Sequence, residues 1–120
     1  MEWKRKRIWL FSTLKFEGEY INGNKRGKEY NEKGKLIFKG KYINGKKTGK
    51  VIEYGFINNL DYVKAKGEFL NGDKFGLWKE YDNSHNLKFE GKYLIGKRNG
   101  KGKEYDYNGN LEFEGEYLNS

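Results

Sequence analysis

Apolar and polar residues alternate along short segments that recur through the chain. In the segment LKFEGKY, which begins at Leu87, apolar residues or glycine take every second position and charged residues fall between them. Alternation with a period of two predicts a β-strand with one face buried and the other in water. Apolar residues do not recur at spacings of three and four, so no helix is predicted. Equivalent segments begin at Leu14, Leu36, Val63 and Leu111.

The predicted strands belong to a sequence repeat. Each copy has a mid-strand glycine followed two positions later by an aromatic residue: Gly18 and Tyr20, Gly40 and Tyr42, Gly67 and Phe69, Gly91 and Tyr93, Gly115 and Tyr117. The glycines are 22, 27, 24 and 24 residues apart, and a period in this range is typical of repeat architectures. Glycine weakens a strand, so its return in one register indicates that a neighbouring aromatic ring lies over the bare backbone.

Turn residues separate the two strands of each unit. Asn-Gly follows the first strand at Asn22, Asn44 and Asn71, and Ile95-Gly96 takes its place in the fourth copy. Asn-Gly between alternating segments is the strongest short signal for a β-hairpin. A second strand then ends in Glu-Tyr, and a polar loop leads to the next copy. The sequence therefore predicts an all-β fold, an elongated single-layer antiparallel meander of about ten strands, roughly 45–50 Å long at ~4.8 Å per strand.

The repeat array is expected to cover residues 14–120 as four and a half units. Residues 1–13 are expected to form a worn half-repeat that caps the array, as terminal repeats usually must. The alignment behind this interpretation places Ile8 where later copies have Tyr81 and Tyr105.

Two copies depart from the common length. The first copy is two residues shorter between Gly27 and Tyr30, a change that keeps every strand side chain on its own face. The second copy is three residues longer, and we assign the extra residues to an inserted loop from Gly55 to Tyr62, because loops tolerate insertion.

The composition agrees with a sheet covered by aromatic rings. Phe, Tyr and Trp make up 18% of the chain and charged residues 35%, so aliphatic side chains for a two-layer core are few. The absence of cysteine excludes disulfides and thiolate metal sites. The basic start is followed by an apolar stretch, Ile8 to Phe11, that is shorter than the ~7–15 residues of a signal peptide. No stretch approaches the ~20 apolar residues of a membrane helix, so we expect a soluble cytoplasmic protein.

Candidates for chemistry are weak, and no catalytic, cofactor or metal site is predicted. The segment from Gly100 to Gly102 lacks the third glycine and the helix of a dinucleotide-binding loop, so a structural turn is expected. His85 is the single histidine and lies in a polar loop. Glu114 and Glu116 fall on the polar strand face, where cross-strand lysines are the expected partners. We therefore expect a protein without enzymatic activity.

Basic residues cluster at the turn between the two strands of each hairpin. They are Lys25, Arg26, Lys46, Lys47, Lys74, Lys97 and Arg98. Stacked hairpins would align them along one edge of the sheet, about 10 Å apart. Such an edge is either a solvated border that resists aggregation or a track for an anionic partner such as phospholipid. Nucleic acid is not expected, because no recognition helix is predicted and glutamate balances lysine on the strands.

The third unit carries apolar residues where its siblings are polar. They are Phe75, Leu77 and Trp78, and the neighbouring insertion adds Phe56, Ile57 and Leu60. Apolar residues at an irregularity either fill a twist defect or form a protein-contact site. For the second case we name Phe56, Ile57, Leu60, Phe75 and Trp78 as contact residues.

The units resemble MORN repeats, the "membrane occupation and recognition nexus" family. The residues that carry the resemblance are FEGEYINGNKRGK from Phe16, FKGKYINGKKTGK from Phe38, KGEFLNGDKFG from Lys66 and FEGKYLIGKRNGKGKEY from Phe89. The 24-residue unit and its Lys-Glu-Tyr endings are similar to a bacterial antitoxin-like branch. The resemblance implies an elongated sheet of hairpins used for scaffolding, with protein, self-association or anionic phospholipid as partners.

Two functions remain open at this point. The first is a protein-interaction or scaffolding module that presents an aromatic face and a polar face. The alternative is an adaptor that binds anionic membrane through the basic edge, which salt would weaken more than an apolar protein contact. The two ends of the sheet could also associate with each other between molecules, because they carry opposite charges. Glu112, Glu114 and Glu116 lie on the last strand, and basic residues 4–7 lie near the start. We expect weak, salt-sensitive self-association at most.

Overall fold

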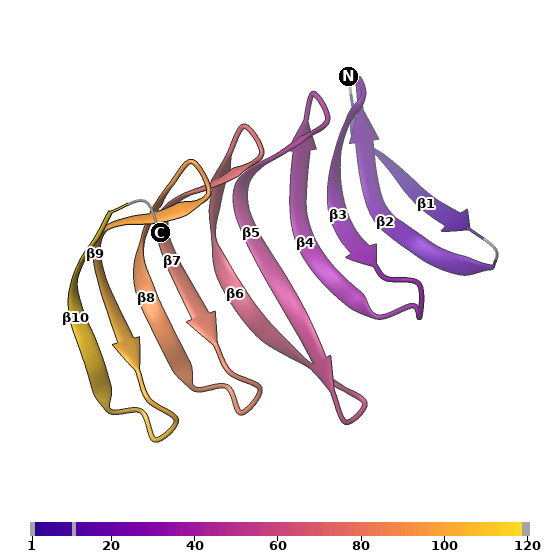
Figure 1. The fold of residues 1–120 in the computed structure, drawn as a ribbon. Coiled ribbons are helices and arrows are strands. Elements are labelled where there is room, and N and C mark those ends of the chain that lie inside the picture. The colour runs from indigo at the N-terminus through magenta and orange to yellow at the C-terminus, as the bar shows by residue number, and fades with distance from the viewer. Residues whose placement is uncertain (1, 11, 119–120) are drawn as a thin grey trace.

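A computed structural model describes residues 2–10 and 12–118, which form one open antiparallel sheet with the strands in sequence order (Figure 1). The fold class is confirmed, because the described residues contain ten strands and no helix, and the sheet measures 45 × 33 × 20 Å. The strands are β1 (Lys4–Leu10), β2 (Thr13–Ile21), β3 (Asn24–Tyr30), β4 (Leu36–Ile43), β5 (Lys46–Ile57), β6 (Leu60–Leu70), β7 (Asp73–Tyr81), β8 (Leu87–Leu94), β9 (Lys97–Tyr105) and β10 (Leu111–Tyr117). Within this described part, no helix is long and apolar enough to cross a membrane.

Two-residue turns close the hairpins where Asn-Gly predicts them. Asn22 and Gly23 have φ angles of 46° and 82°, and the pairs that begin at Asn44 and Asn71 are alike. Positive φ at both central residues is the type I′ geometry, which matches the right-handed twist of the flanking strands. Ile95 adopts φ 49° at the equivalent place, although a β-branched side chain is strained there.

Polar side chains order three of the loops that join the units. The side-chain oxygen of Asp82 accepts hydrogen bonds from the N–H groups of Ser84, at 2.9 Å, and Asn86, at 3.0 Å. Asn31 and Asp106 make the same two bonds in their own loops. Because the pattern recurs, each of these three loops returns the chain to the next strand in the same way.

One face of the sheet, here called the aromatic face, holds the buried side chains. Phe16, Phe38 and Phe89 are almost fully buried, and each packs edge-to-face on the tyrosine four residues later. The mid-strand glycines leave room for these rings: a Cβ on Gly91 would lie 2.7 Å from Cζ of Phe89. The expectation that a ring lies over the strand glycine is therefore confirmed.

The predicted inserted loop from Gly55 to Tyr62 is wrong. These residues extend β5 and β6 into a longer hairpin, in which Gly55 pairs with Tyr62 and Ile57 with Leu60. Asn58 and Asn59 form the turn with φ angles of 51° and 61°. The two adjacent asparagines supply the type I′ turn that closes a hairpin, so the chain forms three further residue pairs before it reverses. The extra residues are therefore strand.

The two residues that the first copy lacks form a bulge in the later hairpins. In the fourth hairpin, three residues of β9 (99–101) lie opposite Lys92 alone, between the pairs Gly91–Gly102 and Tyr93–Arg98. The second and third hairpins show the same two-residue shift, whereas the first has none. Gly100 has φ 91° within the bulge, a conformation that glycine adopts without strain.

β1 pairs antiparallel with β2, and its register corrects the sequence alignment. Ile8 lies opposite Phe16, whereas in later units a glutamate lies opposite the equivalent phenylalanine. Trp9 lies opposite Leu14, as Tyr81 lies opposite the leucine that begins its partner strand. The alignment of Ile8 with the repeat tyrosines is therefore wrong by one residue.

Candidate functional site

The basic residues predicted to follow one edge occupy two different environments. Lys25, Lys47, Lys74 and Arg98 lie within strands and contact rings of the aromatic face. Nζ of Lys25 is 4.8 Å from the ring centre of Phe16 and 4.7 Å from that of Tyr42, in the next unit. The other three also lie over one ring of their own unit and one of the next. These four cations therefore join successive units.

Carboxylates of the Glu-Tyr endings complete these contacts. A guanidinium nitrogen of Arg98 lies 3.2 Å from Oε1 of Glu80, and the hydroxyl of Tyr93 donates a hydrogen bond to the same carboxylate. Burial and this hydrogen bond raise the pKa of Tyr93 above its ordinary value. Burial and a hydrogen bond to Glu104 raise the pKa of Tyr117 to about 12. The aromatic face is thus a closed network of rings, cations and carboxylates.

The remaining basic residues of the predicted track lie nearer to solvent. Arg26 pairs with Glu19 at 2.9 Å, and its guanidinium carbon is 4.2 Å from the ring centre of Trp3. Lys46 and Lys97 are exposed at the first position after their hairpin turns. All seven cations lie near the hairpin-turn ends of their strands, but four of them lie over rings of the aromatic face, so the seven do not form one exposed track.

The five predicted protein-contact residues do not form one patch. Trp78 is 0% exposed and donates a hydrogen bond from Nε1 to the carbonyl of Glu68, so it is not available to a partner. Leu60 is exposed at the start of β6, next to Phe56 and Ile57 on β5. Phe75 pairs with Glu68 near the other end of β6. The apolar residues thus separate into one buried ring, one exposed cluster and one isolated side chain.

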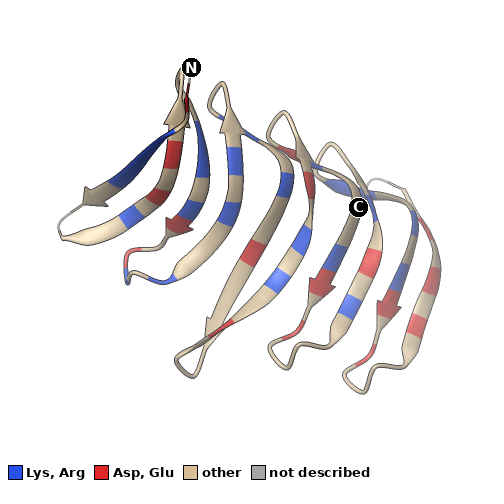
Figure 2. Ribbon diagram, turned by 180° about the vertical axis from the view of Figure 1, so that it is seen from behind, with Lys and Arg blue, Asp and Glu red and all other residues tan. Residues whose placement is uncertain are grey.

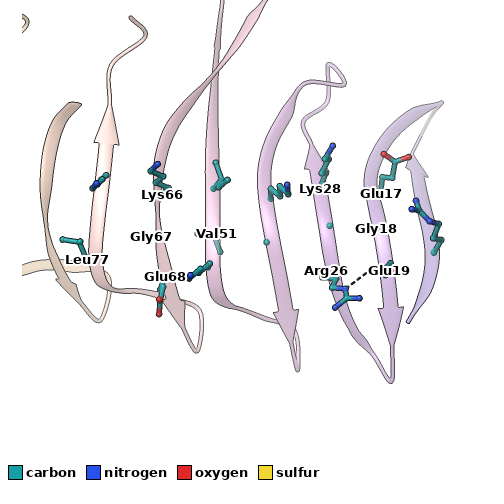
Figure 3. A pocket seen from close by; sticks show the side chains of 17 residues that line it. Glu17, Gly18, Glu19, Arg26, Lys28, Val51, Lys66, Gly67, Glu68 and Leu77 are labelled. Atoms are coloured by element: carbon teal, nitrogen blue, oxygen red, sulfur yellow. Dashed lines mark hydrogen bonds and ion pairs between the residues drawn. The ribbon is translucent and has the colours of Figure 1, made fainter. Parts of the chain in front are cut away.

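A groove that sequence reasoning missed runs over the opposite, polar face from β1 to β7 (Figure 3). Its volume is about 1020 Å³, and backbone of the strand glycines lines it together with Ile52 and Leu77. Seven Lys or Arg side chains and three Glu side chains surround it, an excess of four positive charges. The groove is therefore electropositive and has both apolar and charged surface.

Strand register brings one position of every strand into a single row across the polar face, and nine of its ten residues are charged (Figure 2). The row runs Arg7, Glu17, Lys28, Lys39, Ile52, Lys66, Lys79, Glu90, Lys103, Glu114 from β1 to β10. We call its central members Lys28, Lys39, Lys66 and Lys79 the lysine row. All four line the groove, with Ile52 between the two pairs.

The lysine row breaks the charge pattern of its flanks. Outside it, opposite charges face each other, and ion pairs form between Arg7 and Glu17 at 2.8 Å and between Lys103 and Glu114 at 3.7 Å. Within it, lysine faces lysine twice, on β3 and β4 and again on β6 and β7. Like charges directly opposite each other destabilise a sheet, so these positions cost stability.

The sequence does contain a signal for this row, but the alternation of apolar and polar residues along each strand does not reveal it. The residue before the mid-strand glycine is Glu17, Glu90 and Glu114 in the first, fourth and fifth copies, but Lys39 and Lys66 in the second and third. The second strands carry lysine opposite this position in three of their four copies. A comparison of the copies position by position shows where lysine replaces glutamate. It predicts that two lysines face each other only when the register between the strands is known.

Other chemistry is sparse in the part of the chain that the structure describes. No group of three or more His, Cys, Asp or Glu that could hold a metal ion occurs there. His85 has φ 67° in its loop and packs edge-to-face on Tyr62, with 6.5 Å between the ring centres. Comparisons with protein-family models, with curated proteins and with solved structures gave no match.

Proposed function

We propose that this protein is a non-enzymatic interaction module, a MORN-like scaffold that binds a protein partner in the groove of its polar face. The observation that carries the proposal is the lysine row, which lowers the stability of the sheet without an internal ion pair for Lys28, Lys39 or Lys66 among the described residues. Locally unfavourable residues that recur in a groove are typical of a functional site.

The composition of the groove favours a protein over a small ligand. The groove follows seven strands, so a partner can contact several units at once. Ile52 and Leu77 offer apolar contacts between the charged side chains, the mixture that protein interfaces use. We also propose that the chain is a member of the antitoxin-like branch of the MORN family and that it is located in the cytoplasm.

Single cysteines test where the partner binds, because the natural chain contains none. Leu77→Cys places a photo-crosslinker in the groove, and Leu111→Cys places it on an exposed residue outside the groove. Proteins crosslinked in extracts of the source organism are identified, purified and tested with the unlabelled chain by calorimetry. A purified partner that binds, and that crosslinks from Leu77→Cys but not from Leu111→Cys, supports the proposal. Crosslinking that favours Leu111→Cys contradicts it.

The hairpin turns supply a second candidate function, binding to anionic membrane. Leu70, Leu94 and Ile95 are exposed beside these turns, and Lys46 and Lys97 lie at the turns as well. Backbone hydrogen bonds between successive hairpins hold neighbouring turns together: N–H of Gly96 donates to the carbonyl of Lys74 at 3.1 Å. Exposed apolar side chains next to lysine favour the surface of an anionic bilayer.

Vesicle sedimentation tests this second candidate. Binding to vesicles that contain phosphatidylserine, loss of binding in neutral vesicles, and weaker binding by Ile95→Asn together support it. Leu60→Asn is the matched control, because Leu60 is similarly exposed, at 70% against 73% for Ile95, but it borders the β5–β6 turn at the opposite end of the strands. Equal loss in both variants points to general hydrophobicity and contradicts a membrane-binding turn edge.

A further inference from the structure

We infer that the groove binds an extended acidic peptide segment in which two carboxylates flank an apolar side chain with the spacing acid–x–apolar–x–acid. This inference rests on the proposed function and names the chemistry of the partner. It is drawn from the order of residues in the row, lysine, lysine, isoleucine, lysine, lysine, on five adjacent strands.

Distances along the row set the spacing of the partner residues. The midpoint between Lys28 and Lys39 lies three strand spacings from the midpoint between Lys66 and Lys79, about 14 Å at ~4.8 Å per strand. Residues four apart in an extended chain are separated by about 13–14 Å, and both point to the same side. Ile52 is midway between the two lysine pairs, opposite the place of the central residue. One extended segment can therefore present an acid to each pair and an apolar side chain to Ile52.

The ends of the row limit the length of the anion. Glu17 lies directly beyond Lys28, and Glu90 lies directly beyond Lys79, with a separation of 3.5 Å between Lys79 Nζ and the Glu90 carboxylate. A continuous phosphate chain that crosses the sheet would meet these carboxylates at both ends, and like charges repel it there. A flat bilayer meets the rims of a groove before its floor. A short acidic segment of polypeptide fits these limits better than nucleic acid or membrane.

The test uses a fluorescein-labelled peptide with Glu at both outer positions, Leu at the centre and Ser elsewhere, measured by fluorescence anisotropy on the full chain. We expect wild type to bind it and high salt to weaken the binding, since screening shortens the reach of charges. A peptide with Gln in place of Glu, and one with Leu moved to its end, should each bind more weakly. Equal binding of all three peptides contradicts the proposed spacing.

Charge reversal within the row provides the matched protein variants. Lys39→Glu together with Lys66→Glu restores the residue that other copies carry at this position, and each new glutamate faces a lysine. We expect this double variant to bind at least about tenfold more weakly and to melt at a higher temperature. Lys92→Glu together with Lys101→Glu changes the net charge equally on the polar face, outside the row and the groove. This control should keep the affinity of wild type.

Three outcomes overturn the inference. The first is that wild type does not bind the peptide, and the second is that the control variant loses as much peptide affinity as the row variant. The third is that an oligonucleotide or a phosphatidylserine vesicle binds wild type more tightly than the peptide does, and that this binding is lost in the row variant. The proposed function is tested separately by the position of crosslinking. If a partner crosslinks at Leu77→Cys but the acidic peptide does not bind, only the chemistry assigned to the partner is wrong.

Discussion

Replacing Ile95 by asparagine should stabilise the protein, although it removes an apolar side chain. Ile95 has φ 49° at the first turn position, where the first three hairpins have asparagine at φ 46°, 51° and 49°. The left-handed conformation costs an ordinary L-residue about 1–2 kcal/mol, and asparagine tolerates it best among non-glycine residues. The strain at Ile95 is therefore removable by the residue that the repeat itself uses.

The loss of apolar contact offsets part of this gain. Ile95 is 73% exposed, so about a quarter of its side chain is buried. Full burial of isoleucine contributes about 1.5–3 kcal/mol, which gives about 0.4–0.8 kcal/mol for the buried part. The difference between the two effects predicts that Ile95→Asn raises the free energy of unfolding by about 0.2–1.6 kcal/mol. For a chain of this size, 1 kcal/mol corresponds to about 3–5 °C in Tm.

Urea denaturation followed by tryptophan fluorescence measures the change, and the slope with denaturant should stay constant. Asn71→Ile, in the preceding hairpin at the same φ, is the reciprocal control and should lower stability by a similar amount. Leu94→Asn tests the polar substitution on ordinary strand backbone and should lower stability. If Ile95→Asn is no more stable than wild type while Asn71→Ile is unchanged, backbone strain does not determine the preference for asparagine at these turns.

Three further predictions concern the aromatic face and are measured by denaturation. Gly91→Val should lose about 1–3 kcal/mol, because its Cβ would lie 2.9 Å from Cα of Gly102; a variant as stable as wild type contradicts this packing. Trp78→Ala should lose about 3–5 kcal/mol, and a smaller loss would mean that the rings around it close the cavity. Tyr117, whose pKa rises from 10.0 to about 12 on folding, stabilises the protein below pH 10 and loses this effect as the pH rises through 12. Tyr117→Phe should flatten the pH dependence in this range; an unchanged slope contradicts it.

The repeat in the sequence predicted the strands and most turns because both depend on near neighbours. Alternation around Phe89 and Gly91 assigns a strand and its two faces, and Asn22-Gly23 assigns a type I′ turn. Local rules failed where the chain departs from its own repeat. The residues from Gly55 to Tyr62 do not alternate regularly between apolar and polar, so their pattern does not predict a strand. Asn58-Asn59 is also a weaker hairpin signal than Asn-Gly.

The candidate site depended on which residues face each other across strands. The sequence by itself determined that Lys39 and Lys66 lie on the polar face, since side chains alternate along a strand. It did not determine that each faces another lysine, because two-residue bulges and shifted pairings set the register between strands. It also could not separate Lys74, which lies over Trp78, from Lys97, which is exposed. Neighbours along the chain are given by spacing, whereas neighbours across a sheet exist only after every turn and bulge has fixed the pairing.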